Sequence, residues 1–251
     1  MYFESKFSKK ERSGMGDFYG FQMIEFEFDG RNAKVVLPKK FNGRLVLKTE
    51  YFGAFPDVEV QLVNNGFTLA HVKNTNRWGT EDNVDRQAAF IKYLAGEYHL
   101  NPKAVLVGMS CGGMEAVYLA AKYPENVSVM YLDAPVMNFC SCPGKMGIAT
   151  EESIWDEFYK YRGISKSELI NYREHPVDKL PLLKEHNIPV ILVYGDSDKV
   201  VPYTENGIVL ERFYQENDLC IKALGKAGCG HHPHGLEDPA PIVDFILEHT
   251  M

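Results

Sequence analysis

Long apolar runs are missing from this sequence. None of its 251 residues falls in an uninterrupted apolar stretch approaching the ~18 residues of a membrane-spanning helix. Residues 1–20 carry charges but no apolar segment, so they lack the pattern of a secretory signal, and we interpret them as a poorly ordered arm. Positive charge is also scarce. The 27 Lys and Arg against 34 Asp and Glu give a net charge of −7, which provides no reason to expect nucleic acid or a membrane as a partner.

Cysteine is sparse as well. The five cysteines, Cys111, Cys140, Cys142, Cys220 and Cys229, are scattered and odd in number, which favours free thiols in a reducing cytoplasm over a disulfide framework. Cys140 and Cys142 have the wrong spacing for a zinc knuckle, and no second pair lies nearby in the sequence. These absences predict a cytoplasmic protein without structural disulfides.

What remains is typical of one globular domain. The composition is 45% hydrophobic and 24% charged, and a chain of this length can bury a core without cross-links. Because neither an internal repeat nor a low-complexity segment divides the chain, we expect a single domain over residues 1–251. The sequence also permits a homo-oligomer.

The apolar pattern predicts an α/β fold. Alternating apolar residues at 21–30 and 31–40 predict a hairpin, followed by strands at 44–50 and 66–74 with a helix at 57–66 between them. The later predicted elements are a helix at 82–99, a strand at 104–108, a helix at 114–123, strands at 127–135 and 188–196, a helix at 204–217, a strand at 219–224 and a helix at 239–250. Alternating strands and helices predict a mostly parallel twisted sheet with helices on both faces, and the hairpin adds an antiparallel edge.

One segment interrupts this alternation. Residues 136–187 separate two predicted strands by far more than an ordinary crossover. The segment is rich in aromatic residues and has several short helical patterns. We interpret it as an inserted helical cap, which would lie over the carboxyl ends of the strands, where parallel sheets bind ligands.

A serine lies where a buried strand becomes a helix. The motif Gly108-Met109-Ser110-Cys111-Gly112 fits G-x-S-x-G between an apolar strand and a helical pattern. Such a turn strains the backbone at the serine and exposes its hydroxyl, while neighbouring glycines relieve the crowding. The N–H of Cys111 at the helix start is then available to a developing oxyanion. The alternative is a glycine-rich turn with an incidental serine.

A serine nucleophile needs a histidine base held by a carboxylate. In the chain order Ser, Asp, His, the acid follows a later strand. Asp198 is our first choice because it lies on the loop beyond the strand at 188–196. Asp196 is expected to stabilise the turn. Asp133, at the end of an earlier strand, is the alternative acid.

Three histidines follow the strand predicted at 219–224, within GKAGCGHHPHG. We favour His231, directly after Gly230, as the base, with His232 as second choice and His234 as a pocket or packing residue. Histidines in a glycine-rich loop also suggest a metal site. Since H-H-x-H spacing is poor for zinc and no further carboxylate–histidine pattern completes it, we expect neither a metal nor a cofactor.

Together these motifs resemble the α/β-hydrolase superfamily. GMSCGG, GDSDKVVP and CGHHPHG occur in the order typical of it, and the match covers most of the chain from about residue 44. The resemblance implies a serine hydrolase of esterase type with a Ser110–His231–Asp198 triad and no cofactor.

A second, partial resemblance concerns the strand end TEYFG, residues 49–53, which is similar to the Q-E-I-F-G turn of dienelactone hydrolases. This likeness implies that Tyr51 donates the second oxyanion N–H, beside Cys111. Those enzymes have a cysteine nucleophile and lack so long an insertion, so their substrate specificity does not carry over. Glu50 is then a residue that either contacts substrate or fixes the turn through hydrogen bonds. The segments LEDPAPIVDFI and DAPV also resemble a group of bacterial hydrolases without an assigned substrate.

These observations favour a serine hydrolase that cleaves a carboxylic ester of a small or carbohydrate-linked molecule. The alternatives are a peptidase, a thioesterase or an acyltransferase of the same fold, or a binding module without catalysis. The candidates for substrate contact are Glu50, Arg77, Trp78, Trp155, Tyr159 and His232. Arg77 could bind a carboxylate or only water. The aromatic residues could line an acyl or sugar pocket or form the cap's own core.

Overall fold

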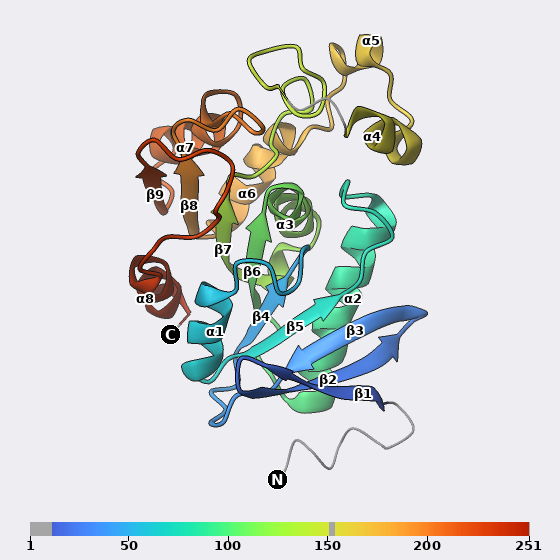
Figure 1. Ribbon diagram of the computed structural model, residues 1–251, viewed down its shortest axis with the longest axis vertical. Coiled ribbons are helices and arrows are strands. Elements are labelled where there is room, and N and C mark those ends of the chain that lie inside the picture. The colour runs from blue at the N-terminus through green and yellow to red at the C-terminus, as the bar shows by residue number, and fades with distance from the viewer. Residues whose placement is uncertain (1–11, 151–153, 251) are drawn as a thin grey trace.

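The computed structural model describes residues 12–150 and 154–250, which form one sheet covered by helices (Figure 1). The strands are β1 (Arg12–Phe18), β2 (Phe21–Phe28), β3 (Arg31–Val36), β4 (Leu45–Lys48), β5 (Thr68–Val72), β6 (Ala104–Met109), β7 (Val127–Asp133), β8 (Val190–Gly195) and β9 (Ile221–Lys226). The helices are α1 (Asp57–Asn64), α2 (Glu81–Tyr98), α3 (Cys111–Lys122), α4 (Trp155–Arg162), α5 (Lys166–Leu169), α6 (Leu180–His186), α7 (Gly207–Glu216) and α8 (Ala240–His249). Short 3₁₀ turns are η1 (Pro124–Asn126), η2 (Pro176–Lys179) and η3 (Tyr203–Glu205).

The nine strands of the described residues have the order β1-β2-β3-β5-β4-β6-β7-β8-β9. The first four in this order pair antiparallel, and all pairs from β5–β4 onward are parallel. The predicted mostly parallel sheet with an antiparallel edge is thereby confirmed. All parallel strands end at the same edge, where the predicted site residues follow β4, β6 and β8.

Side-chain alternation along the central strands separates two apolar layers. In β6, Ala104 and Leu106 join the cluster that α2, α3, α6 and α7 cover, whereas Val105 and Val107 join the cluster that α1 and α8 cover. Figure 1 shows α1 and α8 together on one side of the sheet. The sheet is therefore covered on both faces, as the continuous apolar run of β6 predicts. None of the helices within 12–150 and 154–250 has the length and apolar character needed to cross a bilayer.

The N-terminal prediction was wrong in part. Residues 12–18 form the edge strand β1, which pairs with β2 from Phe18 opposite Phe21 to Arg12 opposite Phe26. The sequence RSGMGDF has two glycines and little apolar alternation, so local pattern gave no strand. Its order comes from hydrogen bonding to the edge of β2. The remainder of the predicted arm, residues 1–11, lies outside the described residues.

The long connection between β7 and β8 has two parts. The helix α6 packs beside α3, with Leu180 and Leu183 buried in the main core. The helices α4 and α5 lie beyond the carboxyl ends of the strands, at the top of Figure 1. Only the part with α4 and α5 therefore lies at the position predicted for the cap, beyond the carboxyl ends of the strands. The 136–187 boundaries proposed from sequence stay a prediction.

Candidate active site

The turn at Ser110 has the strained geometry that the sequence predicts. Ser110 lies between β6 and α3 with φ 52° and ψ −120°, a left-handed φ that a side chain rarely adopts. The turn is tight enough that a Cβ on Gly108 would lie 2.5 Å from the Gly112 carbonyl oxygen. The Ser110 N–H donates to the Asp133 carbonyl at 2.9 Å, and the Ser110 carbonyl accepts from the N–H of Gly113. Hydrogen bonds to Asp133 and Gly113 thus hold Ser110 in this conformation, and the absence of a side chain at Gly108 leaves room for the tight turn.

The three residues of the predicted triad lie in hydrogen-bond contact. His231 Nε2 lies 3.1 Å from Ser110 Oγ, and His231 Nδ1 lies 2.7 Å from Asp198 Oδ2. The other oxygen of Asp198 accepts the N–H groups of Val200 and Val201 at 2.8 and 2.9 Å. Burial opposes ionisation of Asp198, but the hydrogen bond from His231 and the two backbone donors outweigh it, so the pKa of Asp198 lies below its ordinary value. Because the carboxylate only accepts, the His231 proton sits on Nδ1 and Nε2 faces the serine.

The alternative acid holds a different histidine. Asp133 Oδ1 lies 2.8 Å from His234 Nδ1, and Asp133 Oδ2 accepts the Gly235 N–H at 2.6 Å and the Tyr131 hydroxyl at 3.2 Å. Asp133 and His234 are both buried. Asp196 instead accepts the N–H of Gly228 at 2.8 Å, which fits the turn role expected for it. Two buried aspartate–histidine pairs therefore lie side by side at this edge of the sheet.

The predicted oxyanion donors differ in their surroundings. Cys111 is the first residue of α3, where the N–H groups have no partner one turn earlier in the helix. Burial raises the pKa of the Cys111 thiol to about 12, so the thiol stays protonated and cannot compete with Ser110 as a nucleophile. The Tyr51 N–H, at φ 57°, donates to Glu50 Oε1 at 3.2 Å. An oxyanion at Tyr51 must therefore replace this contact to Glu50.

A cavity of about 520 Å³ opens above Ser110. Its apolar lining residues include Phe55, Met109, Cys142, Ile154 and Val200, which lie on four different loops or element ends. The predicted residues Tyr51, Arg77, Ser110, Cys111, His231 and His232 also line it, together with His234.

Arg77 is not a free cation in this cavity. Its Nε and one terminal nitrogen donate to the same oxygen of Glu157, at 3.1 and 2.5 Å. Glu157 belongs to α4, so this ion pair joins the loop after β5 to the segment beyond the strand ends. A substrate carboxylate would have to displace Glu157 to reach Arg77.

Four predicted substrate contacts do not reach the cavity lining. Trp78 is fully buried and packs edge-on against Phe158 at 5.1 Å, so its role is in the core, which corrects the sequence interpretation. Trp155 also packs on Phe158, at 5.4 Å, and Tyr159 is 52% exposed. Glu50 lies behind the turn, where Asn74 donates to it at 2.7 Å, so its hydrogen bonds fix the turn.

Sequence reasoning missed a buried polar cluster behind the Ser110 turn. Glu115 of α3 is fully buried and accepts from Gln87 at 2.7 Å and Asn74 at 2.6 Å. Burial, and then the neighbouring Glu50, raise the pKa of Glu115 well above its ordinary value. The missed signal was Glu115 itself, a lone carboxylate in the apolar helix pattern MEAVYLAA.

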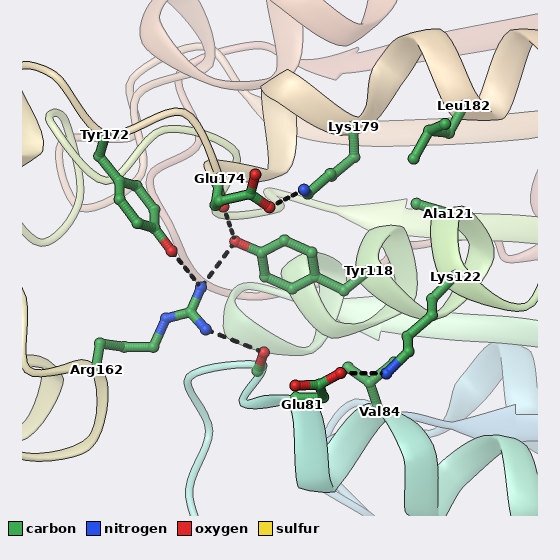
Figure 2. A pocket seen from close by; sticks show the side chains of 11 residues that line it. Glu81, Val84, Tyr118, Ala121, Lys122, Arg162, Tyr172, Glu174, Lys179 and Leu182 are labelled. Carbon is green, nitrogen blue, oxygen red and sulfur yellow. Dashed lines mark hydrogen bonds and ion pairs between the residues drawn. The ribbon is translucent and has the colours of Figure 1, made fainter.

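A second cavity, of about 470 Å³, lies between α2, α3 and the β7–β8 connection (Figure 2). Arg162 of α4 reaches into it and donates to the Tyr118 hydroxyl at 3.0 Å and the Tyr172 hydroxyl at 3.4 Å. The Tyr118 hydroxyl in turn donates to the Glu174 carbonyl at 2.6 Å. These contacts join the connection to α3, and Ser110, His231 and Asp198 do not line this cavity.

The comparison with protein families agrees with this architecture. A family model described as the alpha/beta hydrolase fold matches residues 65–151, which include β6, Ser110 and α3. The chain therefore has the α/β-hydrolase fold. None of the curated proteins matches the sequence.

Solved structures share the α/β-hydrolase fold at low sequence identity. Est1E from Butyrivibrio proteoclasticus is 17% identical with a TM-score of 0.62, and the match covers 95% of this chain and 98% of that one. Porphyromonas gingivalis dipeptidyl peptidase 4 is 13% identical with a TM-score of 0.66, covering 91% of this chain but 35% of that one. Pyrococcus horikoshii acylaminoacyl peptidase is 13% identical with a TM-score of 0.65, covering 92% and 39%. The chain thus spans little more than a third of the two peptidases.

Proposed function

We propose that this α/β-hydrolase is a serine hydrolase that cleaves a carboxylic ester through an acyl-enzyme on Ser110. One observation carries the proposal. Ser110 Oγ, the two ring nitrogens of His231 and Asp198 Oδ2 form a continuous chain with 3.1 and 2.7 Å contacts, and Ser110 lines a cavity of about 520 Å³. A base within hydrogen-bond reach of an exposed hydroxyl is the geometric requirement for nucleophilic activation.

The proposed reaction has two acyl-transfer steps. His231 Nε2 takes the Ser110 proton as Oγ attacks the ester carbonyl carbon, and the protonated ring then delivers that proton to the leaving alkoxide. Water repeats the sequence on the acyl-enzyme and releases the acid. Asp198 keeps the His231 proton on Nδ1 and stabilises the charged ring, which its own ionised state at neutral pH supports.

The oxyanion site is proposed to use the N–H groups of Cys111 and Tyr51. Each such donor is commonly worth ~3 kcal/mol of barrier. Cys111 offers its N–H at the start of α3, with the helix dipole behind it. The Tyr51 N–H becomes available once the developing oxyanion replaces Glu50 Oε1. Glu50 stays bound to Asn74, so this exchange needs only a rotation of the carboxylate.

The cavity favours a small, mostly apolar acyl or alcohol group. Phe55, Met109, Ile154 and Val200 supply apolar surface. Arg77 is the one Lys or Arg among the described residues of the lining, and it is paired with Glu157. A carbohydrate-linked ester fits if its sugar lies toward the open side at His232, which is exposed and stacks on Phe55 at 5.6 Å. The rings of His232 and Phe55 would then offer aromatic surface on which the apolar face of a sugar can pack.

We further propose that the part of the β7–β8 connection with α4 acts as a cap. Ile154 and Cys142 of this connection line the cavity, and Glu157 reaches across to Arg77. A cytoplasmic location, a bacterial source and a homo-oligomer stay predictions from the sequence.

Peptide hydrolysis is the second candidate. It is favoured by the names of two of the structural neighbours, a dipeptidyl peptidase and an acylaminoacyl peptidase. This chain spans little more than a third of either peptidase. Their peptidase activity is therefore weaker support for the function of this chain than the cavity of about 520 Å³, which suits a small ester. Thioester cleavage and acyl transfer would use the same Ser110 chemistry, whereas a binding module has no need of the aligned Ser110–His231–Asp198 contacts.

The test compares p-nitrophenyl esters of two to eight carbons with peptidyl p-nitroanilides on the wild type, Ser110→Ala and Ser167→Ala. Ser167 is an exposed serine of α5 and serves as the matched control. We expect ester turnover with an acyl-enzyme burst, lost in Ser110→Ala and retained in Ser167→Ala. Faster anilide than ester cleavage would favour the peptidase. Full ester turnover by Ser110→Ala would refute the proposal.

A further inference from the structure

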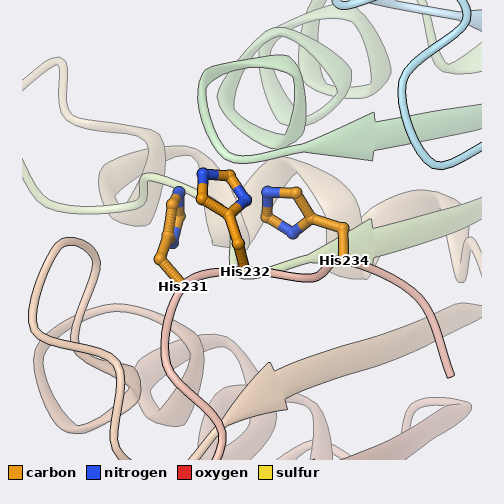
Figure 3. Close-up of side chains that lie close together, drawn as sticks. All are labelled: His231, His232 and His234. Carbon is orange, nitrogen blue, oxygen red and sulfur yellow. The ribbon is translucent and has the colours of Figure 1, made fainter.

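Three histidine side chains gather in front of the sheet edge. His231, His232 and His234 follow β9 on one short loop, and their ring centroids lie 4.8, 4.9 and 4.9 Å apart. Figure 3 shows the three rings side by side on the same side of this loop. One ligand nitrogen from each ring can be chosen so that all three lie within 4.8 Å of one another. The H-H-x-H spacing, judged poor for zinc from sequence, therefore folds into a convergent set.

Two of these rings are oriented as metal-ligating histidines are. Buried carboxylates accept the Nδ1–H of His231 at 2.7 Å and of His234 at 2.8 Å. Each ring therefore presents Nε2 as an acceptor with a fixed direction. Histidine ligands in proteins almost always have such a partner on the second nitrogen, because it fixes the tautomer and raises the basicity of the first.

The third ring is the one that can adjust. His232 is exposed, and no carboxylate–histidine contact holds it among the described residues; it stacks on Phe55. Zinc–nitrogen bonds of about 2.0–2.1 Å in a tetrahedral site place ligand nitrogens about 3.3 Å apart. Closing the set from within 4.8 Å shortens the longest separation by up to about 1.5 Å, through rotation of the exposed His232 ring and small shifts of the loop that carries all three histidines.

We propose that His231, His232 and His234 bind one divalent transition-metal ion of the zinc type, and that the bound ion inhibits the hydrolase. Imidazole nitrogen suits Zn²⁺, Cu²⁺ and Ni²⁺. The ion takes the lone pair of His231 Nε2, so the hydrogen bond from Ser110 Oγ is lost and the base is no longer available. A water molecule or Ser110 Oγ completes the fourth position. Metal binding stands on the three rings alone, whereas inhibition rests on the proposed serine hydrolase function.

The experiment begins with the full chain freed of metal by a chelator and then dialysed. Zn²⁺ binding is measured by calorimetry and Co²⁺ binding by visible absorption, on the wild type, His232→Ala, His234→Ala and the control His186→Ala. His186 is an exposed histidine at the end of α6. We expect one ion per chain for the wild type and the control, and affinity at least about tenfold weaker in both cluster variants. The Co²⁺ spectrum should lack thiolate charge-transfer bands, which excludes Cys111 and Cys229 as ligands.

A variant outside the ligand set separates binding from folding. Asp133→Asn keeps all three histidines but weakens the hold on His234 Nδ1, and loss of such a partner typically lowers metal affinity about 10- to 100-fold. Circular dichroism confirms that each variant compared is folded. If Asp133→Asn does not fold, His232→Ala carries the test, because His232 is exposed.

Inhibition is measured for each variant as the ratio of its fluorophosphonate labelling rates with and without Zn²⁺. This ratio cancels any difference in labelling rate that the substitution causes in the absence of Zn²⁺. We expect at least a tenfold reduction for the wild type that EDTA reverses, and little change for His232→Ala. No binding, or equal binding after loss of His232 and His234, would overturn the proposal. Labelling that is unchanged or faster with bound Zn²⁺ would overturn the inhibitory role. Wild type that binds Zn²⁺ but never labels would refute the serine hydrolase and leave the metal site standing.

Discussion

Two aspartate–histidine pairs lie at the same edge of the sheet, and only one of them contacts a nucleophile. His231–Asp198 and His234–Asp133 have nearly equal contacts, 2.7 and 2.8 Å, and their histidines lie three residues apart on one loop. The difference is at Nε2. That of His231 lies 3.1 Å from Ser110 Oγ, whereas the His234 ring packs against Phe55 at 5.2 Å. A buried pair is therefore not a catalytic dyad by itself, and the group at Nε2 distinguishes the two.

The second pair has a structural consequence for the first. The Asp133 side chain binds His234 and the Gly235 N–H, and its carbonyl accepts the Ser110 N–H at 2.9 Å. One residue at the end of β7 thus fixes both the loop that carries His231 and the turn that carries Ser110. We infer that the His234–Asp133 pair positions both the Ser110 turn and the loop that carries His231.

The largest predicted difference lies between the two histidines. His231→Ala should reduce kcat/KM for a p-nitrophenyl ester by about 10⁴- to 10⁶-fold, because Ser110 loses its base. His234→Ala should reduce it by less than about tenfold, because Ser110 Oγ has its hydrogen bond with His231 and not with His234. Rates are measured on chelator-treated enzyme at matched folded fraction. Equal losses in both variants would mean that the two histidines act as one unit.

Substitution of Asp198 should change mainly kcat, whereas substitution of Asp133 should change mainly the free energy of unfolding. Asp198→Asn should lower kcat by about 10⁴-fold with stability little altered, since the amide favours the wrong tautomer of His231. Asp133→Asn should lower the free energy of unfolding by about 1–3 kcal/mol, because a buried acceptor of three hydrogen bonds loses charge and geometry. Urea unfolding and steady-state kinetics on both variants check this. The account fails if Asp133→Asn loses activity as severely as Asp198→Asn while keeping wild-type stability.

A third buried histidine sharpens the comparison because its partner is a carbonyl. His71 Nδ1 donates to the Lys48 carbonyl at 2.8 Å, and burial, with the charges of Lys34 and Lys48, lowers the pKa of His71 to about 4. The unfolded chain binds this proton near pH 6.5 and the folded chain does not, so His71 contributes stability at pH 7 that is lost as pH falls.

His71→Asn removes this titration. Between pH 7 and pH 5 the wild type should lose about 2 kcal/mol more unfolding free energy than the variant. Denaturant unfolding at both pH values measures the difference, with His186→Ala as the control that keeps His71. Parallel pH profiles for the wild type and His71→Asn would show that His71 titrates normally.

The smallest predicted effect concerns the half-exposed pair that joins the site to α4. Arg77 and Glu157 are 32% and 35% exposed, so their coupling should be below about 1 kcal/mol and should weaken in salt. A double-mutant cycle of Arg77→Met and Glu157→Gln, followed by thermal unfolding, gives this coupling. A coupling of several kcal/mol would indicate that this pair resembles the buried pairs more than a surface contact.

These contrasts show where the sequence was sufficient. The strand–turn–helix around Ser110 and the order Ser110, Asp198, His231 followed from local pattern, since glycines, apolar runs and chain order are all written in the sequence. The contact of Asp133 with His234 could not be predicted from the sequence. The fold of the loop at 230–235 decides which histidine ring contacts which carboxylate. Trp78 was misinterpreted for the same reason: only tertiary packing against Phe158 shows that it is core. β1 was missed because its order depends on pairing with β2.

The most direct measurement of the central claim is fluorophosphonate labelling of metal-free enzyme, with the modified peptide identified by mass spectrometry. The set is the wild type, Ser110→Ala, His231→Ala and His234→Ala. The account predicts modification at Ser110 in the wild type and in His234→Ala, and none in the other two. Labelling that depends on His234 but survives His231→Ala, or a modified residue other than Ser110, would contradict it.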